Sequence, residues 1–232
     1  YNRLKKDKVE MFFGDDIQGY ENGKLKVQGK EIEAEKVLNA SMRGAVLPPM
    51  DIDLQLEAGF VQTDEYLKTN HDSIYAVGDV NGKSYLAHAG SAQGLFVINN
   101  IKGIKGEMNL HNYPLNIYTN PEMAQIGLTE EELQSENIQY KVSEFPLSAN
   151  GKALIEGYKD GSIRMLSEKK YGEVLGVQII APHATDMIAE ASAFMQIEST
   201  IYDVARSIHA HPTISEIFME AGFDAVDKAI HK

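Results

Sequence analysis

Apolar and polar residues alternate along the first forty residues, a pattern typical of half-buried β-strands. The alternation runs through residues 8–13 (KVEMFF) and 23–40 (GKLKVQGKEIEAEKVLNA), and the sequences ENG and QGK interrupt it as turns. Within the second stretch, a short exposed strand is expected to lead into a more buried one. The two prolines of VLPPM end this part of the chain, because proline cannot donate to a strand ladder.

From about residue 60 the pattern predicts a strand, a loop and a helix. Ile74 to Val77 form a short apolar run bounded by turn residues, which indicates a buried strand. This strand would place Asp79 at its carboxyl end, where α/β folds bind ligands. Apolar residues then recur at helical spacing up to a glycine terminator, at Leu86, Ala89, Leu95, Ile98 and Gly103.

Beyond about Asn109 the pattern becomes that of an α+β domain. Residues 116–133 predict a strand, a turn, a strand and a helix that opens with a capping box of Thr129 and Glu132. Residues 161–180 predict a hairpin around the turn KKYGE, and residues 184–200 predict an amphipathic helix with a methionine-rich face. A last helix is expected from Thr213 to Ile230. Three or four antiparallel strands with helices on one face would result.

Composition and charge exclude several classes of function. The 232 residues are 43% apolar and carry a net charge of −12, from 34 acidic and 22 basic side chains. This balance argues against nucleic acid or an anionic membrane as partner, since both reward clustered Lys and Arg. Neither a transmembrane segment nor an N-terminal signal peptide is expected. The absence of cysteine excludes disulfides, thiolate metal sites and cysteine nucleophiles within the chain, and makes a cytosolic setting the default expectation.

The stretch HAHPTISE, residues 209–216, holds the strongest candidate chemistry and admits three interpretations. A metal site would need a third ligand, and no further His/Asp cluster stands near it in the sequence. Thr213 and Glu216 also fit a capping box that only starts the last helix. In the third interpretation, Glu216 accepts a hydrogen bond from one imidazole nitrogen of His211 and leaves the other as an acid–base group. Periodicity does not decide between the capping box and the acid–base pair.

Asp79 likewise has a structural and a functional interpretation. An aspartate after a buried strand can simply cap a turn or a helix. Functionally, its carboxylate would accept hydrogen bonds from a diol, and Gly78 would let the backbone approach the ligand closely. The predicted helix start at Tyr85–His88 would present free N–H groups and a positive dipole end to an electron-rich part of the same ligand.

Four stretches, in order, resemble motifs of one enzyme family. Residues 69–94 (TNHDSIYAVGDVNGKSYLAHAGSAQG) resemble the second FAD-binding motif of pyridine nucleotide-disulfide oxidoreductases, and residues 208–218 (IHAHPTISEIF) resemble the active-site signature of the dihydrolipoamide dehydrogenases. Residues 118–133 and 172–190 resemble their dimer-interface domain. The resemblance implies an α/β plus α+β architecture: the end of an NAD-binding domain in residues 1–40, the C-terminal part of an FAD-binding domain in 41–108, and an interface domain with an antiparallel sheet and helices in 109–232.

The resemblance also implies roles for individual residues. His211 matches the histidine that exchanges a proton with the substrate dithiol, Glu216 matches its paired carboxylate, and the bond from His211 to Pro212 is expected to be cis. Asp79 matches the aspartate that binds the ribityl chain of FAD. The family uses FAD and NAD, acts on dihydrolipoamide or a lipoyl domain, and forms homodimers in which this histidine pair serves the partner's flavin. The segment that faces the flavin is matched by Tyr85, Leu86, Ala87 and His88.

Several family features are missing from the sequence. It has neither the G-x-G-x-x-G turn for FAD, nor the redox-active cysteine pair, nor the second glycine fingerprint for NAD. Met42, beside Arg43, stands where the family has a glycine, and a side chain there is expected to hinder contact with NAD. We therefore expect the C-terminal part of a longer flavoenzyme, inactive by itself and holding FAD poorly or not at all. The alternatives are an isolated dimerisation module without activity, or a related reductase acting on another disulfide.

Overall fold

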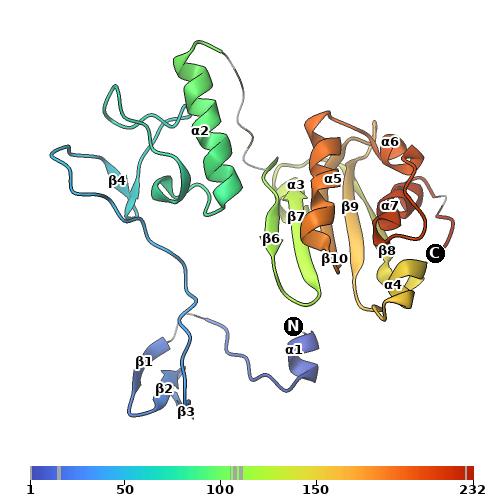
Figure 1. The fold of residues 1–232 in the computed structure, drawn as a ribbon, viewed down its shortest axis with the longest axis horizontal. Helices are drawn as coiled ribbons and strands as arrows, with labels where there is room; N and C mark the ends of the chain where they lie inside the picture. The colour runs from blue at the N-terminus through green and yellow to red at the C-terminus, as the bar shows by residue number, and fades with distance from the viewer. Residues whose placement is uncertain (1, 15–16, 105, 107–108, 110–111, 228) are drawn as a thin grey trace. The chain divides into compact units, whose positions relative to one another are not determined.

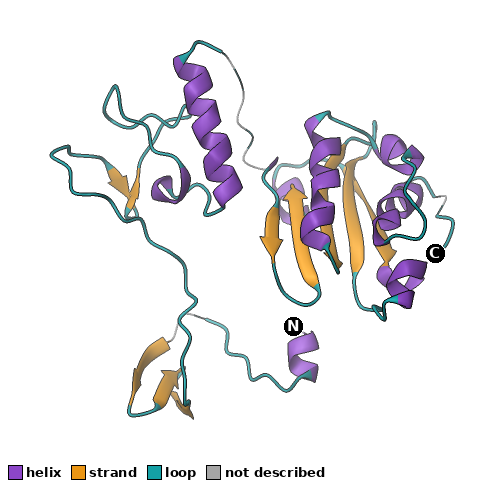
Figure 2. Ribbon diagram, viewed as in Figure 1, coloured by secondary structure: helices purple, strands orange, loops and turns teal. Residues whose placement is uncertain are grey.

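The computed structural model describes residues 2–14, 17–104, 106, 109, 112–227 and 229–232. It contains two compact units, one up to Gly44 and one from Ala45 onward (Figure 1). The first unit holds α1 (Asn2–Lys6) and an antiparallel sheet of β1 (Ile17–Glu21), β2 (Lys24–Val27) and β3 (Lys30–Glu33). Figure 2 shows these three strands with the helices and strands of the second unit. None of the described helices has the length and apolar character needed to cross a bilayer.

The turns predicted in the first unit are confirmed, but part of its strand prediction is wrong. Two residues between β1 and β2 have positive φ, Asn22 at 51° and Gly23 at 76°, as a tight hairpin turn requires. The predicted strands at residues 8–13 and 34–40 are not formed, and the predicted buried end is instead open, with Leu38 89% exposed. Alternating residues make a strand only where a neighbouring strand pairs with their backbone and covers their apolar side.

The second unit begins with β4 (Leu56–Glu57), β5 (Phe60–Val61), the 3₁₀ helix η1 (Gly78–Asn81) and α2 (Ala87–Ile101). The predicted strand Ile74–Val77 is wrong, because the only pairing of this segment among the described residues is the single bridge from Tyr75 to Lys68. The predicted helix and its terminator are confirmed, with Gly103 at φ 74° just past α2. Its apolar face is as predicted only in part: Ala89 is buried, but Leu95 is 68% exposed, and the other buried residues are Gln93 and Val97.

The remainder of the second unit is an α+β domain, as predicted. Its antiparallel sheet has the order β6-β7-β10-β9-β8. The strands are β6 (Leu115–Ile117), β7 (Glu122–Gly127), β8 (Tyr140–Pro146), β9 (Ser162–Glu168) and β10 (Val174–Ala181). The sheet therefore has five strands, not three or four, because β8 pairs along its length with β9. The predicted hairpin is β9–β10, and the predicted capping box of Thr129 and Glu132 opens α3 (Glu130–Ser135).

The helices that follow β10 in the sequence lie on one face of this sheet (Figure 1). The predicted methionine-rich helix is α5 (Ala184–Gln196), which packs on β7 and β10. The predicted last helix is shorter: η4 (Ile214–Glu216) leads into α7 (Ile217–Ala225), which packs on β8 and β9. The prediction extended to Ile230 and passed residue 228, which lies outside the described residues. Two short helices were not predicted, α4 (Gly151–Ile155) and α6 (Ile201–Arg206).

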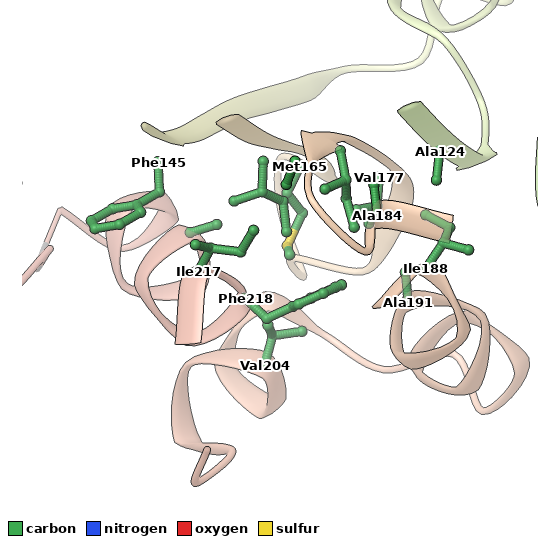
Figure 3. Packing of buried hydrophobic residues seen from close by; sticks show 14 of the residues in the cluster. Ala124, Phe145, Met165, Val177, Ala184, Ile188, Ala191, Val204, Ile217 and Phe218 are labelled. Carbon is green, nitrogen blue, oxygen red and sulfur yellow. The ribbon is translucent and has the colours of Figure 1, made fainter. Parts of the chain in front are cut away.

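The core lies between the sheet and these helices (Figure 3). Phe145 of β8, Met165 of β9 and Phe218 of α7 belong to one cluster of buried apolar side chains, and each is at most 1% exposed. Ile188 and Ala191 of α5 join the same cluster. Because α7 is buried along this face, the short segment that precedes it is held in a fixed position over the domain.

Glu122 joins β7 to the start of α5. Its Oε2 accepts hydrogen bonds from the Thr185 amide at 3.0 Å and from the Thr185 hydroxyl at 2.6 Å. The N-cap residue of α5, His183, makes no side-chain cap hydrogen bond, so a carboxylate from another element satisfies this turn. The Thr185 hydroxyl, followed by its amide, lowers the pKa of Glu122 below the ordinary value of 4.5.

Replacing this carboxylate should weaken the domain in a pH-dependent way. We expect Glu122→Gln to lower the free energy of unfolding at neutral pH by about 1 kcal/mol, because the amide oxygen still accepts from Thr185 but hydrogen bonds to a charged acceptor are stronger than those to a neutral one by about this amount. A lowered folded-state pKa gives stability that is present above the ordinary pKa of 4.5 and is lost as pH falls through the folded-state pKa. The difference from wild type should therefore shrink in acid. Urea unfolding at neutral pH and in acid, below pH 4.5, measures the stability difference between Glu122→Gln and wild type. The control is Glu198→Gln, which replaces an exposed carboxylate. Equal unfolding midpoints for the two variants at neutral pH would contradict the prediction.

Candidate active site

The structure brings His211 and Glu216 together. His211 Nδ1 lies 3.0 Å from Glu216 Oε1, and the two side chains are 79% and 20% exposed. A carboxylate can only accept, so the imidazole donates from Nδ1 and the lone pair of the neutral ring lies on Nε2. Among the described residues Nε2 has no hydrogen-bond partner. The ring is thus oriented by one nitrogen and accessible at the other, which is the arrangement of a general acid–base group.

The capping box and the acid–base pair turn out to be compatible. Glu216 Oε2 accepts the Thr213 amide at 2.8 Å, which forms the capping box at the start of η4, while Oε1 contacts His211. The two oxygens of one carboxylate therefore serve the helix start and the imidazole at once. Because the cap fixes where Glu216 points, it also fixes the position of the histidine.

The segment around His211 is tightly held. The bond from His211 to Pro212 is cis, as expected. The Thr213 hydroxyl donates to the Ala210 carbonyl at 2.7 Å, and Asn150 donates to the Thr213 carbonyl at 3.1 Å. Asn150 is 5% exposed and also caps α4. The His211 side chain is therefore exposed to solvent while the backbone that carries it is held in place by these hydrogen bonds.

Burial and hydrogen bonding act in opposite directions on Glu216. Desolvation raises its pKa, but the Thr213 amide and the contacts with His211 and His209 outweigh this, and the net pKa lies below the ordinary value. Glu216 is consequently a carboxylate at neutral pH. An ionised partner stabilises the imidazolium that forms when His211 accepts a proton.

The two histidines of HAHPTISE do not converge on one point. His209 Nε2 lies 2.7 Å from Glu190 Oε1 of α5, and the His209 side chain is 7% exposed. Among the described residues there is no group of three or more His, Cys, Asp or Glu side chains that could hold a metal ion. The histidines thus belong to two separate pairs, and the imidazole ring is exposed in the His211 pair and buried in the His209 pair.

The residues predicted to meet the flavin gather where η1 meets α2. Gly78 has φ 76°, a conformation that side chains disfavour, and its Cα lies 3.3 Å from an ideal Cβ built on Gly90 of α2. Asp79 lies in the first turn of η1. Leu86 is the N-cap residue of α2 and makes no side-chain cap hydrogen bond, so the amides of the first helical turn are open to a ligand.

The remaining predicted flavin residues stand at the same helix start. The Tyr85 ring packs edge-on against Phe60, with 5.8 Å between ring centroids. Ala87 is the first residue of α2, and His88 Nε2 lies 2.8 Å from the Pro114 carbonyl oxygen. Tyr85 therefore sits on a support, and His88 already uses one of its ring nitrogens.

A buried amide pair, which the sequence analysis missed, joins η1 to α2. Gln93 Oε1 accepts the Gly78 amide at 2.7 Å and Asn81 Nδ2 at 2.9 Å. Gln93 is fully buried, and Asn81 also donates to the Ala76 carbonyl at 3.0 Å. These contacts hold Gly78 and Asp79 against the helix. The sequence does carry a sign of this pair: Gln93 is a polar residue on the face of α2 that is otherwise apolar, and a buried polar residue needs a hydrogen-bond partner.

The sequence of this chain matches two models of one protein family. Residues 2–94 match the model of the pyridine nucleotide-disulphide oxidoreductases, and residues 113–222 match the dimerisation domain of the same family. Dihydrolipoyl dehydrogenase of Bacillus subtilis is 37% identical over 202 residues, which cover 85% of this chain and 43% of that protein. The Chlamydia muridarum dihydrolipoyl dehydrogenase is 39% identical over 175 residues, 75% of this chain and 38% of that protein.

Solved structures show the same fold. LpdA from Mycobacterium tuberculosis superposes with a TM-score of 0.86 at 20% identity, over 95% of this chain and 50% of that one. The HOCl-induced flavoprotein disulfide reductase RclA from Escherichia coli superposes with a TM-score of 0.80 at 18% identity, over 94% of this chain and 52% of that one. The chain thus spans about half the length, or less, of the proteins it matches. The two family models together account for most of its residues, and the chain belongs to the pyridine nucleotide-disulphide oxidoreductase family.

Proposed function

We propose that this chain is the C-terminal part of an FAD- and NAD-dependent dihydrolipoamide dehydrogenase. Residues 1–40 would end its NAD-binding domain, residues 41–108 its FAD-binding domain, and residues 109–232 would form its interface domain. The observation that carries the proposal is the 3.0 Å contact of His211 Nδ1 with Glu216 Oε1, which leaves Nε2 exposed to a substrate.

In this function the pair moves a proton at His211 Nε2. A dithiol must lose a proton before its sulfur can attack a disulfide, because the thiolate is the nucleophile. His211 takes that proton from the dihydrolipoyl thiol, and Glu216 stabilises the resulting imidazolium through Nδ1–H. The reverse transfer returns the proton when the thiolate leaves. The attacked disulfide would be the family's redox-active cysteine pair, which this chain does not contain. As the lipoyl disulfide forms, that enzyme disulfide would be reduced to a dithiol, and FAD, when bound, would take the electron pair from it and pass it to NAD.

The residues around η1 fit one part of an FAD site. Asp79 offers a carboxylate to a diol such as the ribityl chain, and Gly78 leaves room for the backbone to approach it. The start of α2, from Leu86 to His88, offers amides and a positive dipole end to the electron-rich edge of the ring. A pyrophosphate site would need a glycine turn at another helix start, and the sequence contains no G-x-G-x-x-G. We therefore propose that the isolated chain holds FAD poorly or not at all.

A homodimer would cover the His211 loop. Ile208, three residues before His211, is 97% exposed, and a fully exposed isoleucine beside a candidate catalytic histidine favours a partner surface over solvent. A second, partly apolar surface is a groove on the face of the sheet away from the core, with Leu115, Ile117, Met123 and Ile180 beside Gln125 and Gln178. A second copy of the chain packed against the His211 loop would bury Ile208 and close the substrate path over His211.

The dimer is testable at Ile208. We expect wild-type chain to sediment as a dimer at micromolar concentration, and Ile208→Glu to weaken association at least tenfold by placing a charge in the contact. Ile155→Glu is the matched control, since Ile155 is also an exposed isoleucine, at 74%, but lies at the end of α4. A wild-type monomer at high micromolar concentration would contradict the dimer.

The activity is tested with the isolated chain and with the full-length protein that contains it. The full-length protein should bind FAD stoichiometrically and reduce NAD with dihydrolipoamide, whereas the isolated chain should be colourless and inactive. If the full-length protein oxidised another dithiol but not dihydrolipoamide, the related disulfide reductase would replace this proposal. If it neither bound flavin nor reduced any disulfide, the chain would be a dimerisation module. A yellow, active isolated chain would overturn the fragment interpretation.

A further inference from the structure

A second histidine–carboxylate pair is carried by the same loop as the first. His209 is two residues before His211, yet its side chain is 7% exposed where that of His211 is 79% exposed. Its ring stacks on Phe218 of α7, with 6.4 Å between centroids and 8° between planes. Its Nε2 lies 2.7 Å from Glu190 Oε1 of α5. The loop that carries His211 is thus attached through this one ring to both helices that cover the sheet.

Both ring nitrogens of His209 face acceptors. Nδ1 lies 3.2 Å from the Ser207 carbonyl oxygen, which can only accept, and Nε2 faces the Glu190 carboxylate, which when ionised also only accepts. A neutral imidazole has one N–H and would leave one of these contacts unfilled. The doubly protonated ring fills both. The hydrogen bond to Glu190 also raises the pKa of His209 against the effect of burial, and the Ser207 carbonyl and the charge of Glu216 add to it.

A protonated His209 would act on the carboxylate of the exposed pair. The elements around the ring contribute Glu190 from α5, Glu216 from η4 and the uncharged Phe218 from α7. The charge of His209 lowers the pKa of Glu216 and so favours the ionised form that His211 needs. The same ring fixes the loop backbone through Ser207 at one end and α5 at the other.

We infer that His209, held as an imidazolium by Glu190, is a positioning residue for the His211–Glu216 pair, and that Glu190 is part of the same device. From α5 to the surface, the groups would then follow in the order Glu190 carboxylate, His209 imidazolium, Glu216 carboxylate and reacting His211 imidazole. His209 holds the loop in place and keeps Glu216 ionised, while His211 alone meets the substrate. The inference deepens the proposed function and rests on it for its effect on turnover, but the protonation of His209 stands independently.

The protonation is measured on the chain itself. In ¹⁵N-histidine spectra across neutral and mildly alkaline pH, His209, assigned by its loss in His209→Asn, should keep both ring nitrogens protonated at neutral pH. Glu190→Gln keeps an acceptor oxygen of the same shape but removes the charge, so His209 should titrate at lower pH in that variant. Asp186→Asn is the matched control, because it removes an exposed carboxylate one turn earlier in α5. A neutral His209 in the wild-type chain at neutral pH, or no change with Glu190→Gln, would overturn the inference.

The effect on turnover is measured in the full-length enzyme. We expect Glu190→Gln to lower kcat on the order of tenfold, which is the scale of one lost charged hydrogen bond, with little change in KM. The pH profile of kcat should also shift. Asp186→Asn should change neither. If His211→Gln also left turnover intact, the proposed function itself would fail. If His211→Gln abolished turnover while Glu190→Gln behaved as Asp186→Asn, only the positioning role would fail.

Discussion

Replacing His211 by glutamine in the full-length enzyme should lower dihydrolipoamide turnover by a factor on the order of 10²–10⁴, the usual contribution of general acid–base catalysis. Glutamine keeps a donor for Glu216 but has no basic nitrogen at the place of Nε2. The side chain is 79% exposed, so flavin content, dimerisation and thermal stability should stay at wild-type levels. Stopped-flow measurement of flavin reduction by dihydrolipoamide locates the loss in the step that needs the proton transfer.

The matched control is another histidine with the same kind of partner. His231 Nδ1 lies 2.5 Å from Glu220 Oε1 and its side chain is 66% exposed, but it follows the far end of α7. His231→Gln should leave turnover within about twofold of wild type, because a contact away from the reacting atoms changes no protonation there. Normal turnover in His211→Gln would show that HAHPTISE only starts a helix.

Glu216→Gln should reduce turnover less than His211→Gln does. The amide oxygen can still accept from His211 Nδ1–H, so the ring stays oriented, but the negative charge that stabilises the imidazolium is gone. The kcat profile should therefore shift along the pH axis as well as fall. A loss equal to that of His211→Gln with an unshifted profile would contradict an orienting and charge-stabilising role.

The local geometry of the candidate site was predictable because it is encoded by neighbours in the sequence. The site is formed by residues close together in the sequence: His211 and Thr213 come just before η4, and Glu216 is its last residue. This spacing alone allowed both a capping box and an acid–base pair. The periodicity left these as alternatives because each needs a carboxylate oxygen. The structure shows that Glu216 has one oxygen for each.

The rest depended on contacts between segments far apart in the chain. Glu190 precedes His209 by 19 residues, and no spacing rule joins a helix to a loop at that distance. The strand predicted at Ile74–Val77 is reduced to one bridge, from Tyr75 to Lys68, because among the described residues its backbone pairs only with the short segment 67–69. The buried face of α2 is set by the amide contacts of Gln93, which a search for apolar periodicity passes over.

Phe218→Ala should be the most damaging single truncation in the interface domain. Phe218 is fully buried, stacks on His209, and packs in the cluster that joins α7 to the sheet (Figure 3). Truncation of a buried phenylalanine costs about 3–5 kcal/mol, and the cost is higher where the surroundings cannot close the cavity. One turn later, an ideal Cβ on Gly222 would lie 2.6 Å from the Ala205 amide nitrogen. Backbone contact therefore already limits how far α6 and α7 can approach each other.

We therefore expect a loss near the upper end of that range, measured by urea unfolding of the chain followed by far-UV circular dichroism. Tyr171→Ala, which truncates an aromatic side chain that is 67% exposed, should stay within about 0.5 kcal/mol of wild type. The loss of the stacking surface should also free the His209 ring, so its ¹⁵N signals should broaden or shift in Phe218→Ala but not in Tyr171→Ala. A cost below about 1 kcal/mol would mean that α6 and α7 close the cavity, and that the contact at Gly222 does not hold them apart.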